Sequence, residues 1–113
     1  MTQEGAPGPD LIAVLVTVPD ATSAAGLARA VVEERLAACV NRLAGVQSIF
    51  HWEGSVDSAT EELLVLKTRR DRFEALSRRI QELHPYDVPE IIALPIVAGN
   101  AEYLAWVHTE ASG

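Results

Sequence analysis

The chain has 113 residues, of which 49% are hydrophobic and 22% are charged, so it is expected to form one compact domain with a single core. Its formal net charge is −7, which argues against nucleic acid or an anionic membrane as a partner. The single cysteine excludes an internal disulfide and fits a reducing compartment, so the sequence predicts a cytoplasmic protein.

The N-terminal residues differ in composition from the rest of the chain. Residues 1–10 are rich in glycine and proline and lack the apolar core of a signal peptide. No apolar run in the sequence approaches the 18 residues that a membrane-spanning helix needs. We therefore expect a disordered tail at 1–10, followed by a single domain at 11–113.

The first predicted elements are a strand and a helix. Residues 11–18 form a continuous apolar run that ends at Pro19, which is typical of a strand buried on both faces. Asp20 and Thr22 are candidate N-caps of the helix that follows. The apolar residues of that helix recur at helical spacing, and we expect it to end near Cys39.

A long hairpin comes next. Strand patterns at 40–43 and 46–52 are separated by an Ala-Gly pair, and Gly45 predicts a bulge or bend at that point. Gly54 marks a turn, and the apolar run at 63–66 forms the returning strand.

The C-terminal half predicts a helix, a strand and a second helix. Thr68 and Asp71 are candidate N-caps, each with an acid three residues later, and an apolar helical stripe then runs to the residue before His84. Residues 91–97 read as a final strand with an internal proline, which places it at an edge or a bulge. Residues 101–110 are expected to form a short terminal helix.

The element order β-α-β-β-α-β predicts an α+β fold of the ferredoxin-like, split βαβ kind, with a short C-terminal helix added. In this arrangement two helices cover one face of a four-stranded antiparallel sheet and leave the other face open. The strands are apolar at both odd and even positions, so the open face is apolar too. An apolar face of that size is rare on a monomer, and the sequence therefore predicts an oligomer.

Five segments resemble the CutA family of divalent-ion tolerance proteins, in the family's order and approximate spacing. They are ERLAACVN at 34–41, WEG at 52–54, LKT at 66–68, HPYDVPE at 84–90 and YLAW at 103–106. The resemblance covers about residues 11–110. It implies a homotrimer with sheets packed around a threefold axis and clefts between subunits. It also implies a part in tolerance of copper and other divalent metals.

The sequence departs from the family pattern at two places. Ala59 stands where the family often has the first of two acidic residues, and only the second, Glu61, is acidic here. His51 occupies a position where an aromatic residue is common. A site that needs both carboxylates would be weakened by the first change.

Cys39 and His84 are the predicted metal ligands. A thiolate suits Cu(I), an imidazole suits Cu(II) or Zn(II), and the resemblance favours copper in either oxidation state, with no metal required for folding. His84 opens a stiff segment in which Pro85 and Pro89 restrict the backbone, so its polar groups should point in fixed directions. The alternatives are a small buried cysteine at a helix end and a histidine that bonds helix carbonyls.

A second set of candidates would line a cleft between subunits and hold a small molecule. These residues are Glu61, Lys67, Tyr86, Glu90 and Trp106. A packing role for the tryptophan, and a lysine stem lying over the sheet edge, are the alternatives.

An enzyme has the least support among the functions considered. The sequence has no glycine-rich phosphate loop and no G-x-S-x-G nucleophile elbow. Three hypotheses remain: a trimeric protein that binds copper or another divalent cation, a trimeric small-molecule-binding or signalling module, and a structural scaffold.

Overall fold

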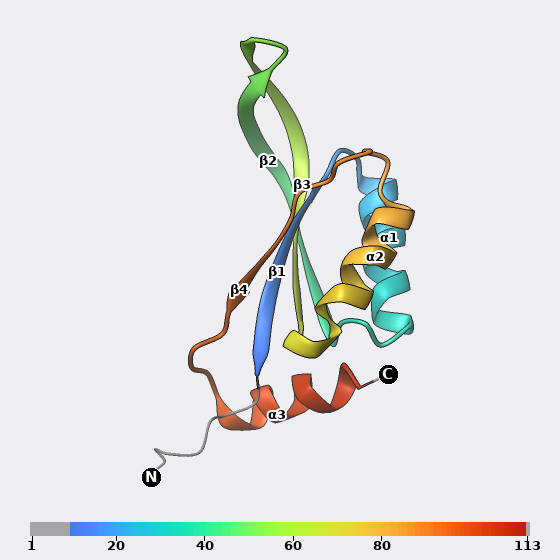
Figure 1. Cartoon of the computed structure of the whole chain (residues 1–113), viewed down its shortest axis with the longest axis vertical. Coiled ribbons are helices and arrows are strands. Elements are labelled where there is room, and N and C mark those ends of the chain that lie inside the picture. Colours follow the sequence, from blue (N-terminus) through green and yellow to red (C-terminus); the bar gives the residue numbers. More distant parts are fainter. Residues whose placement is uncertain (1–9, 113) are drawn as a thin grey trace.

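The computed structural model describes residues 10–112, so residues 1–9 of the tail predicted at 1–10 lie outside the described residues. The elements are β1 (Leu11–Val18), α1 (Ala21–Glu33), β2 (Cys39–Trp52), β3 (Ser55–Arg69), the 3-10 turn η1 (Arg70–Arg72), α2 (Phe73–Leu83), β4 (Ile91–Pro95) and α3 (Ala101–Glu110). The strands form one sheet in the order β2-β3-β1-β4, and every neighbouring pair is antiparallel. This is the predicted α+β, ferredoxin-like fold (Figure 1).

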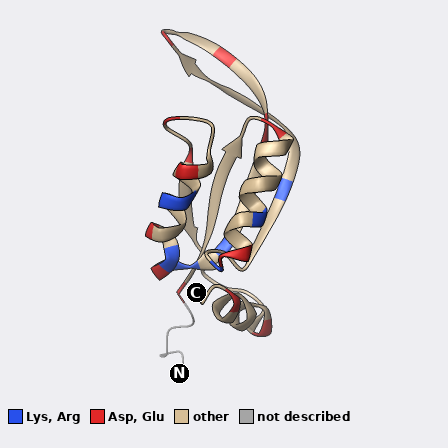
Figure 2. Cartoon of the chain, turned by 90° about the vertical axis from the view of Figure 1, so that its right-hand side faces the viewer, with Lys and Arg blue, Asp and Glu red and all other residues tan. Residues whose placement is uncertain are grey.

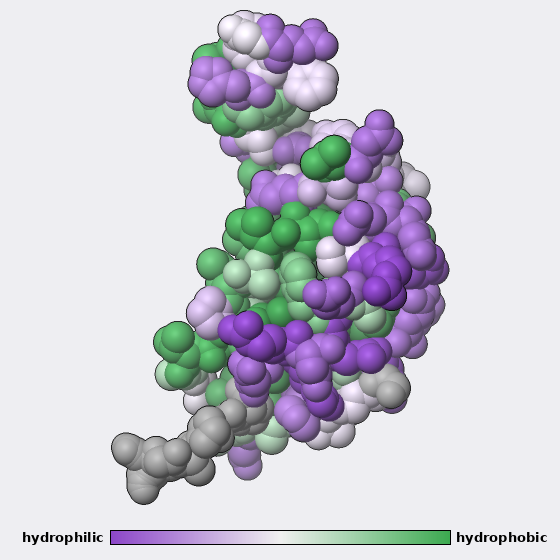
Figure 3. All heavy atoms as spheres, viewed as in Figure 1, coloured by the Kyte–Doolittle hydropathy of each residue, from purple (hydrophilic) through white to green (hydrophobic). Residues whose placement is uncertain are grey.

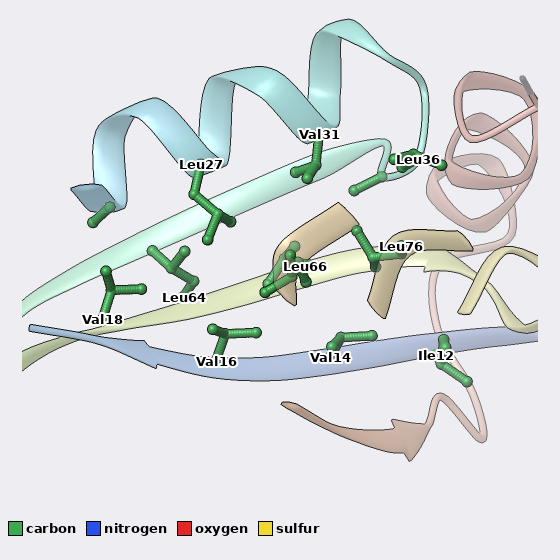
Figure 4. Packing of buried hydrophobic residues seen from close by; sticks show 13 residues of the cluster. Ile12, Val14, Val16, Val18, Leu27, Val31, Leu36, Leu64, Leu66 and Leu76 are labelled. Carbon is green, nitrogen blue, oxygen red and sulfur yellow. The ribbon is translucent and has the colours of Figure 1, made fainter. Parts of the chain in front are cut away.

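The core lies between the sheet and the helix pair α1 and α2. Val14 and Val16 of β1 and Leu64 and Leu66 of β3 are fully buried, and all four occupy even-numbered positions that point to the same face. Leu27 and other aliphatic residues of α1 and α2 cover them (Figure 4). The burial of these side chains away from water is the main force that holds the helices on this face.

The helix layer presents a charged surface on its other side. Charged residues recur along both helices where these face the viewer in Figure 2. They include an ion pair within α1, Arg29 with Glu33 at 3.0 Å, and one between the helices, Arg79 with Glu34 at 2.9 Å. None of the helices within residues 10–112 has the length and hydropathy that crossing a membrane would require.

The opposite face of the sheet carries the odd-numbered residues of β1 and β3 and is largely uncovered. In β4 the even-numbered residues Ile92 and Leu94 lie on this face, because they pair with Leu15 and Ala13. Leu43, Ile92 and Leu94 expose between 46% and 50% of their surface there. Hydrophobic residues gather over the strands between the projecting hairpin and α3 in Figure 3. Among the described elements only α3 packs against this face, and it does so at one end of the strands, where Val107 packs with Leu11. We call this surface the open face.

The β2–β3 hairpin extends well beyond the rest of the sheet, as Figure 1 shows. A register shift between Leu43 and Val46 confirms the predicted bulge, and Gly45 takes a φ of +75° there, which a residue with a side chain rarely adopts. The turn at the tip consists of Glu53 and Gly54, both at positive φ. The hairpin makes the molecule elongated, with extents of 52 × 27 × 22 Å.

The predicted end of the first helix was wrong. α1 ends at Glu33, not near Cys39, because Arg35 adopts a left-handed conformation with a φ of 59°. The amides of Leu36 and the following alanine then both bond to the carbonyl of Val31. The apolar residues after Glu33 therefore continue the core without continuing the helix.

One of the four candidate N-caps is confirmed and three are wrong. Thr22 lies inside the first turn of α1 and does not cap it. Asp20 caps α1, since its carboxylate accepts from the amide of Ser23 at 2.8 Å. Thr68 lies inside β3 and donates its buried hydroxyl to the carbonyl of Leu36 instead. Asp71 pairs with a neighbouring arginine, and neither η1 nor α2 has a side-chain cap.

Strand β4 also ends two residues earlier than predicted, at Pro95, whereas α3 has the predicted bounds.

Candidate functional site

A group of four polar side chains lies on the open face at the end nearest α3. Cys39 begins β2 and pairs with Lys67 of β3, so the two side chains lie side by side. Asn41 follows two residues later on the same face of β2. The ammonium Nζ of Lys67 lies 3.7 Å from Sγ of Cys39 and donates to Oδ1 of Asn41. Tyr103 of α3 completes this group, which we call the thiol cluster.

The position of Tyr103 is fixed by the start of its helix. The side chain of Asn100 caps α3 by accepting from the amides of Glu102 and Tyr103 at 3.0 and 3.1 Å. Burial raises the pKa of the Tyr103 phenol, and the charge of Cys39 and a hydrogen bond to it act in the same direction. The ring of Trp106 lies 5.6 Å from that of Tyr103 and remains 44% exposed.

A second polar group lies beside the far end of β1. His84 follows α2 and is buried, and its Nδ1 accepts the amide N–H of Tyr86 at 3.0 Å. Because this nitrogen is an acceptor, Nε2 carries the ring proton and donates it to the carbonyl of Thr17 at 2.8 Å. Both nitrogens are therefore in use, and a metal ion could bind His84 only by displacing one of these bonds.

Tyr86 connects this histidine to β3. Its hydroxyl donates to the carboxylate of Glu61 at 3.1 Å, and Glu61 is only 7% exposed. Burial raises the pKa of Tyr86, and the hydrogen bond and negative charge of Glu61 raise it further. We call His84, Tyr86 and Glu61 the tyrosine–carboxylate cluster.

The two clusters lie apart on the sheet. Lys67 pairs with Ala13 of β1, whereas His84 bonds to Thr17, four residues further along that strand. At about 3.3 Å per residue this separates the clusters by about 13 Å. Within one chain Cys39 and His84 are therefore not brought to one metal ion.

The predicted cleft residues divide between the two ends. Lys67 belongs to the thiol cluster, with Trp106 on the adjacent helix, and Glu61 and Tyr86 bond to each other at the other end. Glu90 is exposed just before β4. The structure of one chain does not assemble these five residues into a single cleft.

Asn41 and Tyr103 are site residues that the sequence pattern does not predict. A signal for Asn41 was available, because a residue two positions after Cys39 on a strand must share its face. Tyr103 carried no comparable signal, since its contact depends on how α3 docks against the sheet.

Within residues 10–112 these positions hold no ready metal site, and two surface hollows lie elsewhere. Residues 10–112 contain no group of three or more histidine, cysteine or acidic side chains placed to hold a metal ion. Two shallow hollows, of about 430 and 390 Å³, lie along α2 and are lined by residues such as Phe73 and Glu74. Neither is lined by a residue of the two clusters.

The fold and the two polar clusters together define a ferredoxin-like α+β protein with an extended hairpin and one uncovered, apolar sheet face. The sequence profile of the CutA1 divalent ion tolerance protein family matches residues 12–110. The chain belongs to this family, as the five sequence segments predicted.

Individual relatives agree with the family assignment. The divalent-cation tolerance protein CutA of Thermus thermophilus is 53% identical over 95 residues, which cover 84% of this chain and 92% of that protein. The chloroplastic protein CutA of Arabidopsis thaliana is 49% identical over 96 residues, 85% of this chain and 53% of that protein, so the chain spans about half the length of that relative. The crystal structure of CutA1 from Oryza sativa superimposes with a TM-score of 0.89 at 45% identity, covering 91% of this chain and 94% of that one.

Proposed function

We propose that this chain is a cytoplasmic, homotrimeric divalent-ion tolerance protein, a binding protein and not an enzyme, which binds copper through Cys39. The observation that carries the proposal is the position of the chain's one thiol, on the open face beside Asn41 and Tyr103. A thiolate is the soft ligand that copper prefers, and an amide oxygen is an accepted weak additional ligand in copper sites. The names of the relatives, which refer to divalent-cation tolerance, support a metal-related role.

Two features of the surface support assembly through the open face. Its aliphatic residues would be buried by another copy, as is usual for apolar patches of this size. The projecting hairpin exposes Ile49, Trp52 and Val56, each by 59% or more, and a two-stranded hairpin is marginally stable without a packing partner. In a trimer, three copies of Cys39 would be available to share metal ions, which one cysteine per chain cannot enclose alone.

His84 has a different proposed role. Its two hydrogen bonds hold the turn that directs Tyr86 towards Glu61, so we propose that it positions this turn and does not ligate metal in the folded chain. The predicted role of His84 as a metal ligand is tested by the same experiment.

The test is a calorimetric titration of the intact oligomer with copper, beside the variants Cys39→Ser and His84→Ala. Tight binding with integral stoichiometry, lost in Cys39→Ser and kept in His84→Ala, is the expected result. Binding that is unchanged in Cys39→Ser would refute the proposed site. Because copper outcompetes other divalent ions at most nitrogen and sulfur ligands, weak binding that both variants retain would count as adventitious.

The alternative is a small-molecule-binding or signalling module. It is favoured by one observation, the hydrogen bond that the hydroxyl of Tyr86, a residue 41% exposed, donates to the buried carboxylate of Glu61. In an oligomer, a neighbouring subunit could complete a cleft around this pair, with Glu90 at its rim. A thermal-shift screen in which ligands stabilise the wild type but not Tyr86→Phe would favour this alternative. If alanine changes at both clusters alter only the melting temperature and no binding, the chain is a structural scaffold.

A further inference from the structure

Two shallow hollows lie along the flank of α2 that faces away from α1. The first, of about 390 Å³, is lined by Ile12, Arg70, Phe73, Glu74, Ala93 and Pro95. The second, of about 430 Å³, shares Phe73 and Glu74 with the first and continues along the helix to Gln81. Helix α1 lies on the opposite flank, where Arg79 pairs with Glu34 at 2.9 Å. We call the two hollows together the α2 groove, and its other border is the edge strand β4.

The N-terminal tail joins the domain at one end of this groove. The carbonyl of Asp10, the first described residue, accepts from the amide of Arg70 at 2.9 Å, and its carboxylate pairs with the Arg70 guanidinium at 3.2 Å. Arg70 itself lines the groove. An extended chain rises about 3.1 Å per residue in the polyproline conformation, so the six steps from Asp10 back to Glu4 reach about 19 Å. Arg78 lies only about 14 Å from Arg70 along η1 and α2, so Glu4 can come level with it.

The lining of the groove near η1 fits a proline-rich segment. Phe73 contributes an aromatic side chain there, and Pro95 adds apolar surface from β4. The tail ends in Pro7, Gly8 and Pro9. Proline-rich segments favour the polyproline conformation and therefore dock on aromatic grooves at a small entropic cost.

The far part of the groove has a positive charge without a counter-ion. Arg78 lines it and is exposed. Among residues 10–112 no carboxylate pairs with Arg78, although Glu74 lies one helical turn before it. Glu4 is the single acidic residue at positions 1–9, so the tail and this part of the groove have complementary charges.

We propose that residues 1–9 dock along the α2 groove, with Pro7 against the ring of Phe73 and Glu4 paired with Arg78. An attached segment is present at an effective concentration in the millimolar range, so contacts that would be too weak to hold a free peptide suffice. Docking covers apolar surface beside the edge strand β4, and it replaces the disordered tail that composition alone predicts. The inference is independent of copper binding, because the groove contains no residue of the thiol cluster.

The experiment measures backbone order parameters by NMR relaxation in the full-length chain, for the amides of residues 3–6 and of Gly8. Arg78→Glu and Glu4→Arg each reverse one charge of the proposed pair, and the double variant restores the pair with opposite polarity. Phe73→Leu removes the ring and keeps an apolar side chain. Arg29→Glu is the control, since it reverses an exposed charge on α1, away from the groove.

We expect order parameters of about 0.8 in the wild type and in Arg29→Glu, because rigid backbone gives about 0.85 and flexible backbone less than about 0.6. Each single charge reversal should lower them to about 0.6 or less, and the double variant should raise them again. In Phe73→Leu the protons of Pro7 should lose the upfield shift that a neighbouring ring imposes. Phe73 also packs against the core, so circular dichroism checks that this variant is folded. The charge reversals decide the question if it is not.

Three results would overturn the docking. The first is a wild-type tail with order parameters below about 0.6. The second is a tail that stays ordered in Arg78→Glu, because it would then be held somewhere other than the groove. The third is a mobile tail together with α2 amide resonances that shift with protein concentration, which would assign the groove to a second copy of the chain.

Discussion

The two faces of the sheet are built from the same strands and behave differently. On the covered face, Val14 and Leu64 are fully buried by helices of their own chain. On the open face, one residue along each strand, Leu15 and Val65 are aliphatic too, yet within residues 10–112 only α3 approaches that face, at one end of the strands. The covered face therefore supplies the stability of the single chain. The open face is the one that we propose for assembly, and the two polar clusters lie at its ends.

The largest effect is expected from a charge in the middle of the open face. Leu15 lies in the central strand between Val65 and Ile92, so Leu15→Glu would place a carboxylate inside the proposed trimer interface, where burying an unpaired charge is costly. We expect light scattering to show the mass of a single chain, against three times that mass for the wild type. Val32→Glu on the exposed side of α1 is the control and should leave the mass unchanged. A wild-type chain that is already monomeric would contradict the assignment of this face to assembly.

A cavity in the covered face should act on the single chain. Leu64→Ala removes a fully buried side chain beneath the helices and should lower the free energy of unfolding by about 3 kcal/mol. Because Leu94 is half-exposed in one chain, Leu94→Ala should have a much smaller effect once the oligomer has been dissociated by dilution. Urea unfolding at low protein concentration measures both. Equal losses would mean that the two faces do not differ in the way described.

Replacing the buried histidine tests the end of the sheet away from α3. His84→Ala leaves the carbonyl of Thr17 and the amide of Tyr86 without their partner, which should cost about 2 kcal/mol of stability. Urea unfolding measures this loss. His84→Asn, whose side chain can replace part of the hydrogen bonding, should lower the free energy of unfolding less than His84→Ala does. A loss of copper binding without any loss of stability would instead identify His84 as a metal ligand.

The smallest effect concerns the Tyr86 hydroxyl and its pH dependence. Tyr86→Phe removes the hydrogen bond to buried Glu61 and should cost about 1 kcal/mol at neutral pH. The pKa of Tyr86 is raised above its ordinary value of 10.0 in the folded chain, so folding favours the protonated phenol. This contribution is complete below pH 10 and is lost as the pH rises through the folded-state pKa. Wild type should therefore lose more stability than Tyr86→Phe above pH 10, and parallel pH profiles would contradict a raised pKa of Tyr86 in the folded chain.

The fold could be predicted largely because its determinants are local. Strand-length apolar runs, the cap at Asp20 and glycines at the bulge and the hairpin tip specify elements within a few residues of themselves. The misplaced end of α1 shows the limit, since the apolar stripe continues past Glu33 while the backbone turns at Arg35. Thr68 shows the same limit, because its hydroxyl finds a partner 32 residues away and not in the next helix.

The sequence by itself determined the element order, the apolar character of both sheet faces and the family to which the chain belongs. These are properties of neighbouring residues and of short motifs. Only the tertiary structure decided which candidates meet. It places Lys67 against Cys39 through strand register, and it engages both nitrogens of His84 in hydrogen bonds. It also separates the Cys39–Lys67 pair from His84 by about 13 Å along β1. The physical reason is that strand register and helix docking bring together residues far apart in the chain. No local sequence pattern encodes the distances between such residues.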